Sequence, residues 1–218
     1  NLENLIGSFY QPDIVISDVD VLKSLSKREI ICGYGEIIKH SLIKSKKVFN
    51  YLEKNKFKVI KLENNFIQKA IADSCKIKKN IIEKDEKEKN IRKILNFGHT
   101  FAHAYEAAQG YSKKLNHGEA VILGIKSASK FSLVNNHLKK KNYNKIISHI
   151  NNLNLNLNLN KYFNSKDINK IIKFMMSDKK NRSKKINLIL LSDIGKPIIN
   201  FNYNVIKIKS FFKNHLLN

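Results

Sequence analysis

The sequence predicts a mainly helical protein with one strand near its N-terminus and a small β-hairpin near its C-terminus. After residue 26, apolar residues recur with helical spacing over long stretches, whereas β-rich runs occur only at residues 13–18 and 186–200. Hydrophobic residues make up 42% of the chain and aromatic residues 9%, which is typical of a globular protein rather than a disordered one. With 218 residues, the chain is also long enough to bury its own core.

The first predicted element is a strand at residues 13–18 (DIVISD), a β-branched run that follows Pro12. A single strand at the start of a chain needs other strands to pair with. The chain also opens on Asn1 rather than on methionine. Both features lead us to expect that the sequence begins inside a longer protein.

Helices are predicted over most of the remaining chain. Ser26 and Glu29 have the spacing of a capping box, so we expect a helix to begin at about Lys27 and to run through Ile43. Helical periodicity returns in three further stretches, at residues 65–83, 96–108 and 117–133.

The C-terminal part contains an ambiguous tract and a clear hairpin pattern. Residues 151–160 (NNLNLNLNLN) alternate with the period of a strand, but asparagine is a poor strand former and the tract is low in complexity, so we expect a loop or a helix edge. Residues 186–200 form two β-rich runs around Asp193–Gly195, which predicts a hairpin. Residues 205–217 have the pattern of a closing amphipathic helix.

The formal net charge of +23 raises the question of nucleic-acid binding, because clustered cations release counterions from phosphates. Two observations argue against it. Arginine, the favoured reader of phosphates and bases, occurs only as Arg28, Arg92 and Arg182. The lysines are dispersed and accompany asparagine and isoleucine, as expected for a genome rich in A and T. A basic chain suits a small phosphorylated acid equally well, so we do not expect a nucleic-acid partner.

The sequence contains no feature of a membrane or secreted protein. No apolar run approaches the length that spans a bilayer, and the start lacks a signal-peptide pattern. Cys32 and Cys75 lie far apart and form no CxxC motif, which suits a reducing compartment. We therefore predict a cytoplasmic protein without membrane contact.

Two groups of polar residues in apolar surroundings indicate a functional site. Glu36 and Lys39 lie on one face of an otherwise apolar predicted helix, where a carboxylate is costly to bury unless it meets a cation or a metal. The second group steps by four, three and four residues, which predicts one polar stripe on a single helix: Arg92, Asn96, His99 and His103. Apolar neighbours surround this stripe, whereas solvated stripes favour lysine and glutamate.

A third histidine, His117, follows closely in the motif HGEA. Glu36, His99 and His117 together would supply one carboxylate and two imidazoles, a ligand set that suits zinc with an open position for a substrate oxygen. Spacing alone leaves the alternative open that these histidines are ordinary helix residues, because HTFAH lacks the glutamate of the HExxH motif of zinc proteases.

Several stretches of the sequence closely resemble the 3-dehydroquinate synthase family. They are GYGEIIKHSLI (33–43), SCKIKK (74–79), DEKEKNIRKILNFGHTFAHAYE (85–106), HGEAV (117–121), IGK (194–196) and the opening NLIGSFYQPDIVISDVDVLKSL (4–25). The resemblance implies that residues 26–218 form the helical metal- and substrate-binding domain of an α/β + α enzyme. Residues 1–25 would be the tail end of its NAD-binding α/β domain. The glycine-rich segments of that domain are not in this chain, so we do not expect the chain to act alone.

The resemblance also implies roles for individual residues. The metal ligands, for zinc or cobalt, would be Glu36, His99 and His117. The catalytic residues would be Lys39, Arg92, Asn96 and His103, with His103 handling protons near the departing phosphate. Further substrate contacts would be Asn4, Lys78, Glu88 and Lys196. The contribution to NAD binding would come from Val21, Leu22, Lys23, Ser24, Leu25 and Glu29, with Ser24 where the family more often has threonine. Glu3, beside Asn4, stands where the family usually has lysine.

The activity implied is conversion of 3-deoxy-D-arabino-heptulosonate 7-phosphate to 3-dehydroquinate and phosphate in the shikimate pathway, with transient oxidation by NAD and a zinc centre, in a homodimer. Three alternatives remain open from the sequence. The chain could belong to a related sugar-phosphate cyclase, to a metal-dependent polyol dehydrogenase, or to a basic, non-catalytic remnant that associates with nucleic acid. Retention of the polar groups at residues 36, 92–103 and 117 argues against the last of these.

Overall fold

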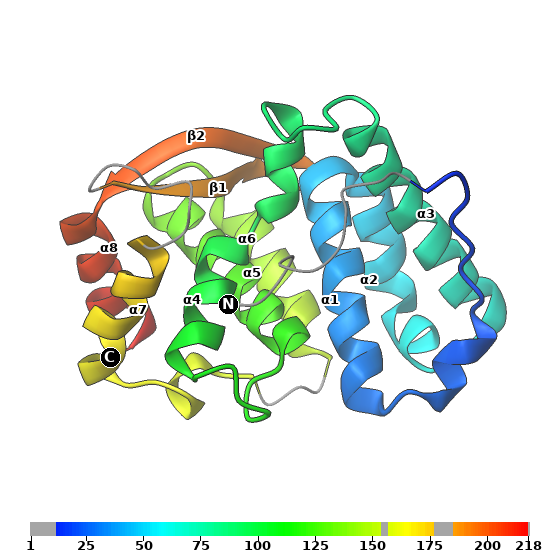
Figure 1. Cartoon of the computed structure of the whole chain (residues 1–218), viewed down its shortest axis with the longest axis horizontal. Helices are drawn as coiled ribbons and strands as arrows, with labels where there is room; N and C mark the ends of the chain where they lie inside the picture. The colour runs from blue at the N-terminus through cyan, green and yellow to red at the C-terminus, as the bar shows by residue number, and fades with distance from the viewer. Residues whose placement is uncertain (1–11, 154–156, 177–184, 218) are drawn as a thin grey trace.

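The structure, a computed structural model, describes residues 12–153, 157–176 and 185–217, and helices dominate it (Figure 1). The α-helices are α1 (Lys27–Lys44), α2 (Lys46–Ile60), α3 (Asn64–Ile82), α4 (His99–Ala108), α5 (His117–Val134), α6 (Lys140–Asn151), α7 (Ile168–Met176) and α8 (Val205–Phe211). Shorter helical turns are η1 (Asp20–Ser24), η2 (Ile91–Asn96), η3 (Leu159–Lys161), η4 (Ser165–Asp167) and η5 (Phe212–Leu216). The strands are β1 (Lys185–Asp193) and β2 (Lys196–Asn204). The mainly helical class is confirmed.

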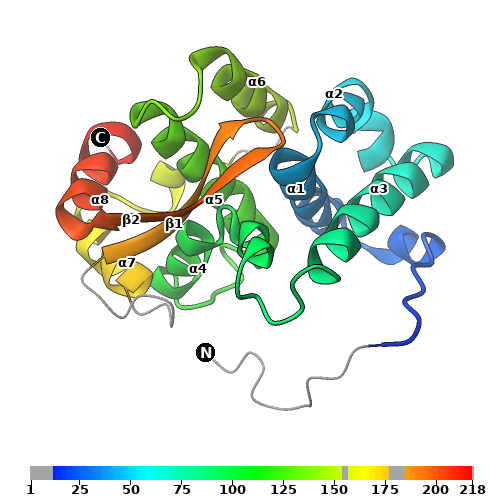
Figure 2. The ribbon, with the colours of Figure 1, turned by 90° about the horizontal axis from the view of Figure 1, so that it is seen from above.

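Helix α5 is the central element of the fold, and it packs against α1 on one side and α4 on the other (Figures 1 and 2). Nearly every position from Gly118 to Ser132 is buried, which matches the near-continuous apolar run of its sequence. The crossing with α4 is close: a Cβ atom on Gly124 would lie 2.2 Å from the carbonyl oxygen of Gly98. Only glycine fits there, and this packing brings the first residues of α4 and α5 near each other.

The hairpin predicted at residues 186–200 is confirmed as an antiparallel pair of strands, with Leu188 opposite Phe201. It lies across one edge of the helical body and packs on α5 (Figure 1). Its turn is tied to the end of α1, because the Gly195 N–H donates to the Leu42 carbonyl oxygen at 2.7 Å.

The predicted strand at residues 13–18 is wrong. The segment forms no strand, and Ile14, Val15 and Ile16 are 75–86% exposed. A strand requires a neighbour that accepts and donates its backbone hydrogen bonds, and within the described residues none lies beside this segment. Figure 2 shows it running along the outside of the molecule into η1.

The helix predicted at residues 96–108 begins later than expected, so the single polar stripe from Arg92 to His103 is also wrong. The η2 turn ends at Asn96, Gly98 takes a left-handed conformation with φ of 82°, and α4 starts only at His99. The close approach of α5 to Gly98 explains the break. The polar residues therefore come from two consecutive elements that meet at an angle.

The other predicted elements agree with the structure. The capping box of Ser26 and Glu29 is present at the start of α1. The predicted helices at residues 65–83, 117–133 and 205–217 correspond to α3, α5 and α8 with η5. In the asparagine-rich tract, the described part forms no strand, while residues 154–156 lie outside the described residues. Helices α2, α6 and α7 were not individually predicted. None of the described helices is long and apolar enough to cross a membrane.

Candidate metal and substrate site

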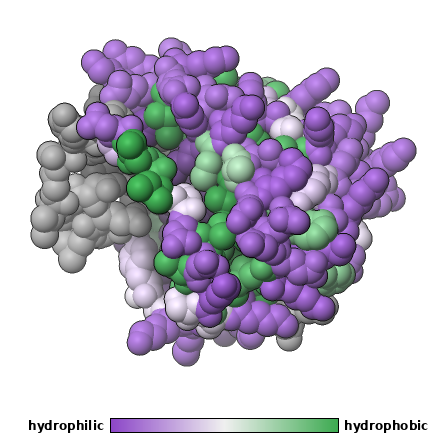
Figure 3. Space-filling model, turned by 90° about the vertical axis from the view of Figure 1, so that its right-hand side faces the viewer, coloured by the Kyte–Doolittle hydropathy of each residue, from purple (hydrophilic) through white to green (hydrophobic). Residues whose placement is uncertain are grey.

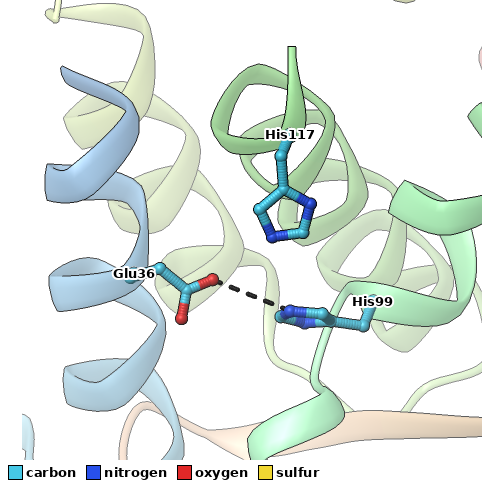
Figure 4. A group of neighbouring side chains, drawn as sticks. All are labelled: Glu36, His99 and His117. Carbon is cyan, nitrogen blue, oxygen red and sulfur yellow. Dashed lines mark ion pairs between the residues drawn. The ribbon is translucent and has the colours of Figure 1, made fainter. Parts of the chain in front are cut away.

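Three side chains from separate helices point toward one another (Figure 4). Glu36 lies in the middle of α1, His99 is the first residue of α4, and His117 is the first residue of α5. Each offers one potential ligand atom, and these atoms all lie within 4.8 Å of one another. The close crossing of α4 and α5 thus brings the two imidazoles to the carboxylate of α1.

The carboxylate of Glu36 has one oxygen engaged and one unsatisfied. Its Oε2 lies 2.6 Å from the Nζ of Lys39, a side chain that is only 5% exposed. Its Oε1 is buried, has no hydrogen-bond partner among the described residues, and lies 3.7 Å from the Nε2 of His99. Burial alone would raise the pKa of Glu36, but the Lys39 ammonium outweighs it and the pKa lies below its ordinary value. An ionised carboxylate oxygen therefore points at the two histidines.

His99 is held as a neutral imidazole. Burial, reinforced by the positive charge of Lys39, lowers the pKa of His99 to about 3. Its Nδ1 lies 3.5 Å from the carbonyl oxygen of Phe97, which accepts a weak hydrogen bond from it, and its Nε2 faces Glu36. A neutral imidazole with one free nitrogen lone pair is the form that binds metals.

His117 is oriented by a residue that the sequence did not single out. The Nδ1 of His117 lies 3.1 and 3.2 Å from the two carboxylate oxygens of Glu106 in α4. Its ring also stacks beside that of His103, with centroids 6.2 Å apart. Glu106 follows His103 by three residues, a helical spacing that could have identified it as a member of the same face.

The start of α5 is anchored to α1 by Arg28. The Nε and Nη2 of Arg28 donate to the Glu119 carboxylate at 2.7 and 2.6 Å, and Nη2 also donates to the carbonyl oxygens of Lys113 and Lys114 at 3.2 Å. Glu119 in turn closes a capping box with Asn116, the N-cap of α5. The backbone that carries His117 is thereby fixed to the helix that carries Glu36.

The three side chains open onto a cavity of about 270 Å³. Its lining is rich in charge of both signs, with cations on α1, α3 and η2. The lining residues are Glu36, Lys39, His40, Lys78, Glu88, Arg92, Leu95, Asn96, His99 and His117. Most of the residues that the family resemblance implies for metal and substrate therefore surround one space.

One wall of this cavity is a loop closed by its own hydrogen bonds. The Asp85 carboxylate accepts from the backbone N–H groups of residues 89, 90 and 92. The Arg92 guanidinium donates to the Glu86 carbonyl oxygen, and the Asn96 amide donates to the Glu88 carboxylate at 2.6 Å. The loop thus holds Arg92, Asn96 and Glu88 in place beside the cavity.

His40 is a further lining residue that sequence reasoning missed. Neither His40 nor His149 has a partner pattern in the sequence, which predicts surface histidines; this prediction is wrong, because both are buried. The Nδ1 of His40 lies 2.6 Å from the hydroxyl of Ser74, and burial lowers the pKa of His40 to about 4. Its spacing of four residues from Glu36 on α1 is the signal that could have found it.

The remaining predicted residues lie elsewhere. His103 is exposed and borders the cluster, with its ring centroid 5.2 Å from that of His99. Lys196 is exposed at the start of β2 and does not line the cavity. Asn4 lies outside the described residues.

The residues predicted to contribute to NAD binding gather at the start of α1. Val21 to Ser24 belong to η1, Leu25 follows it, and Glu29 lies in the first turn of α1. Leu22, Leu25 and Glu29 line a second cavity of about 230 Å³, whose other walls are largely apolar and come from α1, α2 and α3. Figure 3 views this side of the molecule, where apolar patches interrupt a largely hydrophilic surface.

Comparison with protein families and curated proteins gives a consistent result. A family model described as 3-dehydroquinate synthase C-terminal matches residues 33–181. The chain is 58% identical over 214 residues to the 3-dehydroquinate synthase of Pelagibacter ubique, covering 98% of this chain and 58% of that protein. It is 39% identical to the 3-dehydroquinate synthase of Thermodesulfovibrio yellowstonii, covering 91% of this chain and 54% of that protein. The chain therefore spans little more than half the length of these relatives.

Solved structures share the fold. The chain resembles the 2-epi-5-epi-valiolone synthase of Streptomyces hygroscopicus, solved with NAD+ and Zn2+ bound, with a TM-score of 0.82 and 19% identity over 95% of this chain and 56% of that one. It also resembles a 2-deoxy-scyllo-inosose synthase complexed with carbaglucose-6-phosphate, NAD+ and Co2+, with a TM-score of 0.77 and 24% identity over 98% of this chain and 59% of that one.

Proposed function

The chain belongs to the 3-dehydroquinate synthase family, and from this premise we propose that it supplies the metal- and substrate-binding part of such an enzyme. The reaction would convert 3-deoxy-D-arabino-heptulosonate 7-phosphate to 3-dehydroquinate with release of phosphate, as a carbon–oxygen lyase. The observation that carries the proposal is the convergence of Glu36, His99 and His117 on a cavity that cationic side chains also line.

The residues present fit a divalent transition metal. Two imidazoles and one carboxylate are a ligand set that zinc and cobalt accept, and three protein ligands leave a position open for a substrate. The buried Oε1 of Glu36 lacks a hydrogen-bond partner within the described part of the chain, and such an atom is costly unless a cation meets it. When bound, the metal would act as a Lewis acid that polarises a substrate oxygen. We therefore propose Glu36, His99 and His117 as its ligands.

Cationic residues around the cavity would bind the anionic groups of the substrate. Lys39, Lys78 and Arg92 present ammonium and guanidinium groups to one space, and they would hold a phosphate and a carboxylate in fixed orientation. Arg92 is pre-oriented by its hydrogen bond to the Glu86 carbonyl oxygen. Asn96 and Glu88, joined to each other, offer amide and carboxylate groups to substrate hydroxyls.

His103 is the proposed proton carrier beside the phosphate. It is exposed and lies at the edge of the histidine cluster, so its imidazole can exchange protons with water and with a substrate in the cavity. Lys196 and Asn4 stay proposed substrate contacts on the strength of the family motif alone.

The residues at the start of α1 would contribute to the binding of NAD, which supplies the hydride chemistry when bound. Leu22, Leu25 and Glu29 share one cavity, while the Glu29 carboxylate also caps α1. On this proposal residues 1–25 belong to the nucleotide-binding domain and residues 26–218 to the helical domain. The homodimer and the cytoplasmic location are predictions that accompany the proposal.

A related sugar-phosphate cyclase is the second candidate. The valiolone and inosose synthases share this fold at 19% and 24% identity, so the architecture is compatible with it. The 58% identity to a 3-dehydroquinate synthase favours the first candidate.

The proposal is tested first by the metal content of the purified chain. We expect about one zinc per folded chain, and loss of that zinc in Glu36→Ala and His99→Ala with folding retained. His215→Ala, which removes an exposed histidine, is the matched control and should keep its zinc. A folded chain that binds no zinc would contradict the proposed metal centre.

The proposed reaction is tested in a second experiment, which measures activity. The chain is grafted in place of the matching part of the Pelagibacter protein, and phosphate release is followed with 3-deoxy-D-arabino-heptulosonate 7-phosphate and NAD. Turnover that disappears in Arg92→Met supports the proposed reaction. A zinc-loaded, folded graft that releases no phosphate from this substrate would refute it.

A further inference from the structure

Glu106 contacts His117, one of the proposed metal ligands. The family resemblance described above gives Glu106 no role. Its two carboxylate oxygens lie 3.1 and 3.2 Å from the Nδ1 of His117, so this ring nitrogen faces the middle of the carboxylate. The Glu106 side chain is only 12% exposed, whereas that of His117 is 52% exposed. The carboxylate is thus held in the protein while the imidazole reaches from the next helix to meet it.

The helical spacing of α4 explains why the contact forms. His99, His103 and Glu106 follow one another at intervals of four and three residues, so they lie on one face of α4. This face is turned toward His117, whose ring centroid lies 5.9 Å from that of His99 and 6.2 Å from that of His103. One helix therefore presents both a proposed metal ligand and a carboxylate to the same imidazole.

The contact selects one tautomer of His117. A neutral imidazole carries a proton on only one nitrogen, and a carboxylate at Nδ1 can only accept a hydrogen bond. The proton is therefore held on Nδ1, which leaves the lone pair on Nε2. Figure 4 shows the second ring nitrogen of His117 turned toward Glu36 and His99, where that lone pair is needed.

From these contacts we propose that Glu106 is a positioning residue, whose carboxylate fixes the tautomer and ring orientation of His117 for metal binding. Carboxylates that accept from a ligand histidine orient the ring and raise its basicity, and their loss weakens metal binding by about 10- to 100-fold. The inference rests on the proposed function, because it concerns the same metal centre.

If the contact between Glu106 and His117 were purely structural, its removal would lower the stability of the metal-free chain. The backbone at the start of α5 is held independently by Arg28 and Glu119 and by the Asn116 cap, so removal of Glu106 leaves the main chain of His117 in place. What is lost is the restraint on the imidazole alone. We therefore expect Glu106 substitutions to affect the affinity for metal far more than the stability of the metal-free chain.

The test measures zinc affinity by competition with a chromophoric chelator at pH 7, beside urea unfolding of the metal-free proteins. Glu106→Leu removes both charge and acceptor and should weaken zinc binding by about 10- to 100-fold. Glu106→Gln keeps an acceptor oxygen and should show a smaller loss. Glu53→Gln is the matched control. It removes a carboxylate of α2 that lies 2.9 Å from the Nζ of Lys145 in α6, away from the metal site, so its zinc affinity should equal that of the wild type.

The outcomes separate this inference from the proposed function. Zinc binding by the wild type with graded loss from Gln to Leu supports both, and the Gln variant alone suffices if the Leu variant does not fold. If the wild type, Glu106→Gln and Glu106→Leu bind zinc with equal affinity, the role of Glu106 is overturned while the proposed metal centre stands. A folded wild type that binds no zinc overturns both.

Discussion

Replacing His149 with glutamine should make the chain less sensitive to mild acid. His149 lies on α6, only 2% exposed, with its Nε2 3.1 Å from the Tyr34 hydroxyl and its ring centroid 5.3 Å from that of Phe49. Its Nδ1 is buried without a hydrogen-bond partner among the described residues. Burial, followed by the positive charges of Lys56 and Lys145, lowers the pKa of His149 to about 4.

The direction and size of the effect follow from this pKa. A histidine in the unfolded chain has a pKa of 6.5, so between pH 6.5 and about 4 the unfolded state binds more protons than the folded state. The free energy of unfolding is therefore highest above pH 6.5 and falls as the pH falls through this window. Integration from pH 7 to pH 5 gives a loss on the order of 2 kcal/mol from this one side chain.

The measurement is urea unfolding at pH 7 and pH 5 of the wild type, His149→Gln and the exposed-site control His215→Gln. Glutamine can still bond the Tyr34 hydroxyl but does not titrate. His40 and His99 are also buried with lowered pKa values, so the wild type should lose more than the contribution of His149 alone. The variant should lose on the order of 2 kcal/mol less than the wild type. An equal loss in the two proteins would refute the reasoning.

Three further predictions concern packing and capping, and each is measured as a free energy of unfolding in urea at pH 7. Gly124→Ala should destabilise the chain by about 1–3 kcal/mol, because the new Cβ would lie 2.2 Å from the Gly98 carbonyl oxygen; an unchanged midpoint would show that α4 and α5 separate freely. Arg28→Met should cost about 1.5 kcal/mol, since the Glu119 carboxylate would lose its two charged hydrogen bonds. If high salt removed this difference between the variant and the wild type, the pair would be a screened surface contact instead. Ser26→Ala should cost about 1 kcal/mol through loss of the α1 cap, and no change would mean that α1 starts independently of it.

Local elements of this protein could be predicted well where their cause is local. The capping box at Ser26 and the apolar period of α5 predicted helices that the structure confirms. The turn at Asp193–Gly195 likewise predicted the hairpin. In each case the stabilising hydrogen bonds or the buried face belong to residues close together in the chain. The strand predicted at residues 13–18 failed because pairing depends on a distant partner.

The candidate site divides in the same way. The sequence by itself, through residue types and family motifs, determined that a carboxylate, histidines and cations occur in an apolar helical chain. Only the tertiary structure decided that Glu36, His99 and His117 lie within 4.8 Å of one another and that the Glu106 carboxylate contacts the Nδ1 of His117. Helical spacing relates side chains within one helix, whereas distances between α1, α4 and α5 are set by packing. At Gly98 and Gly124 that packing brings the backbones closer than any side chain would allow.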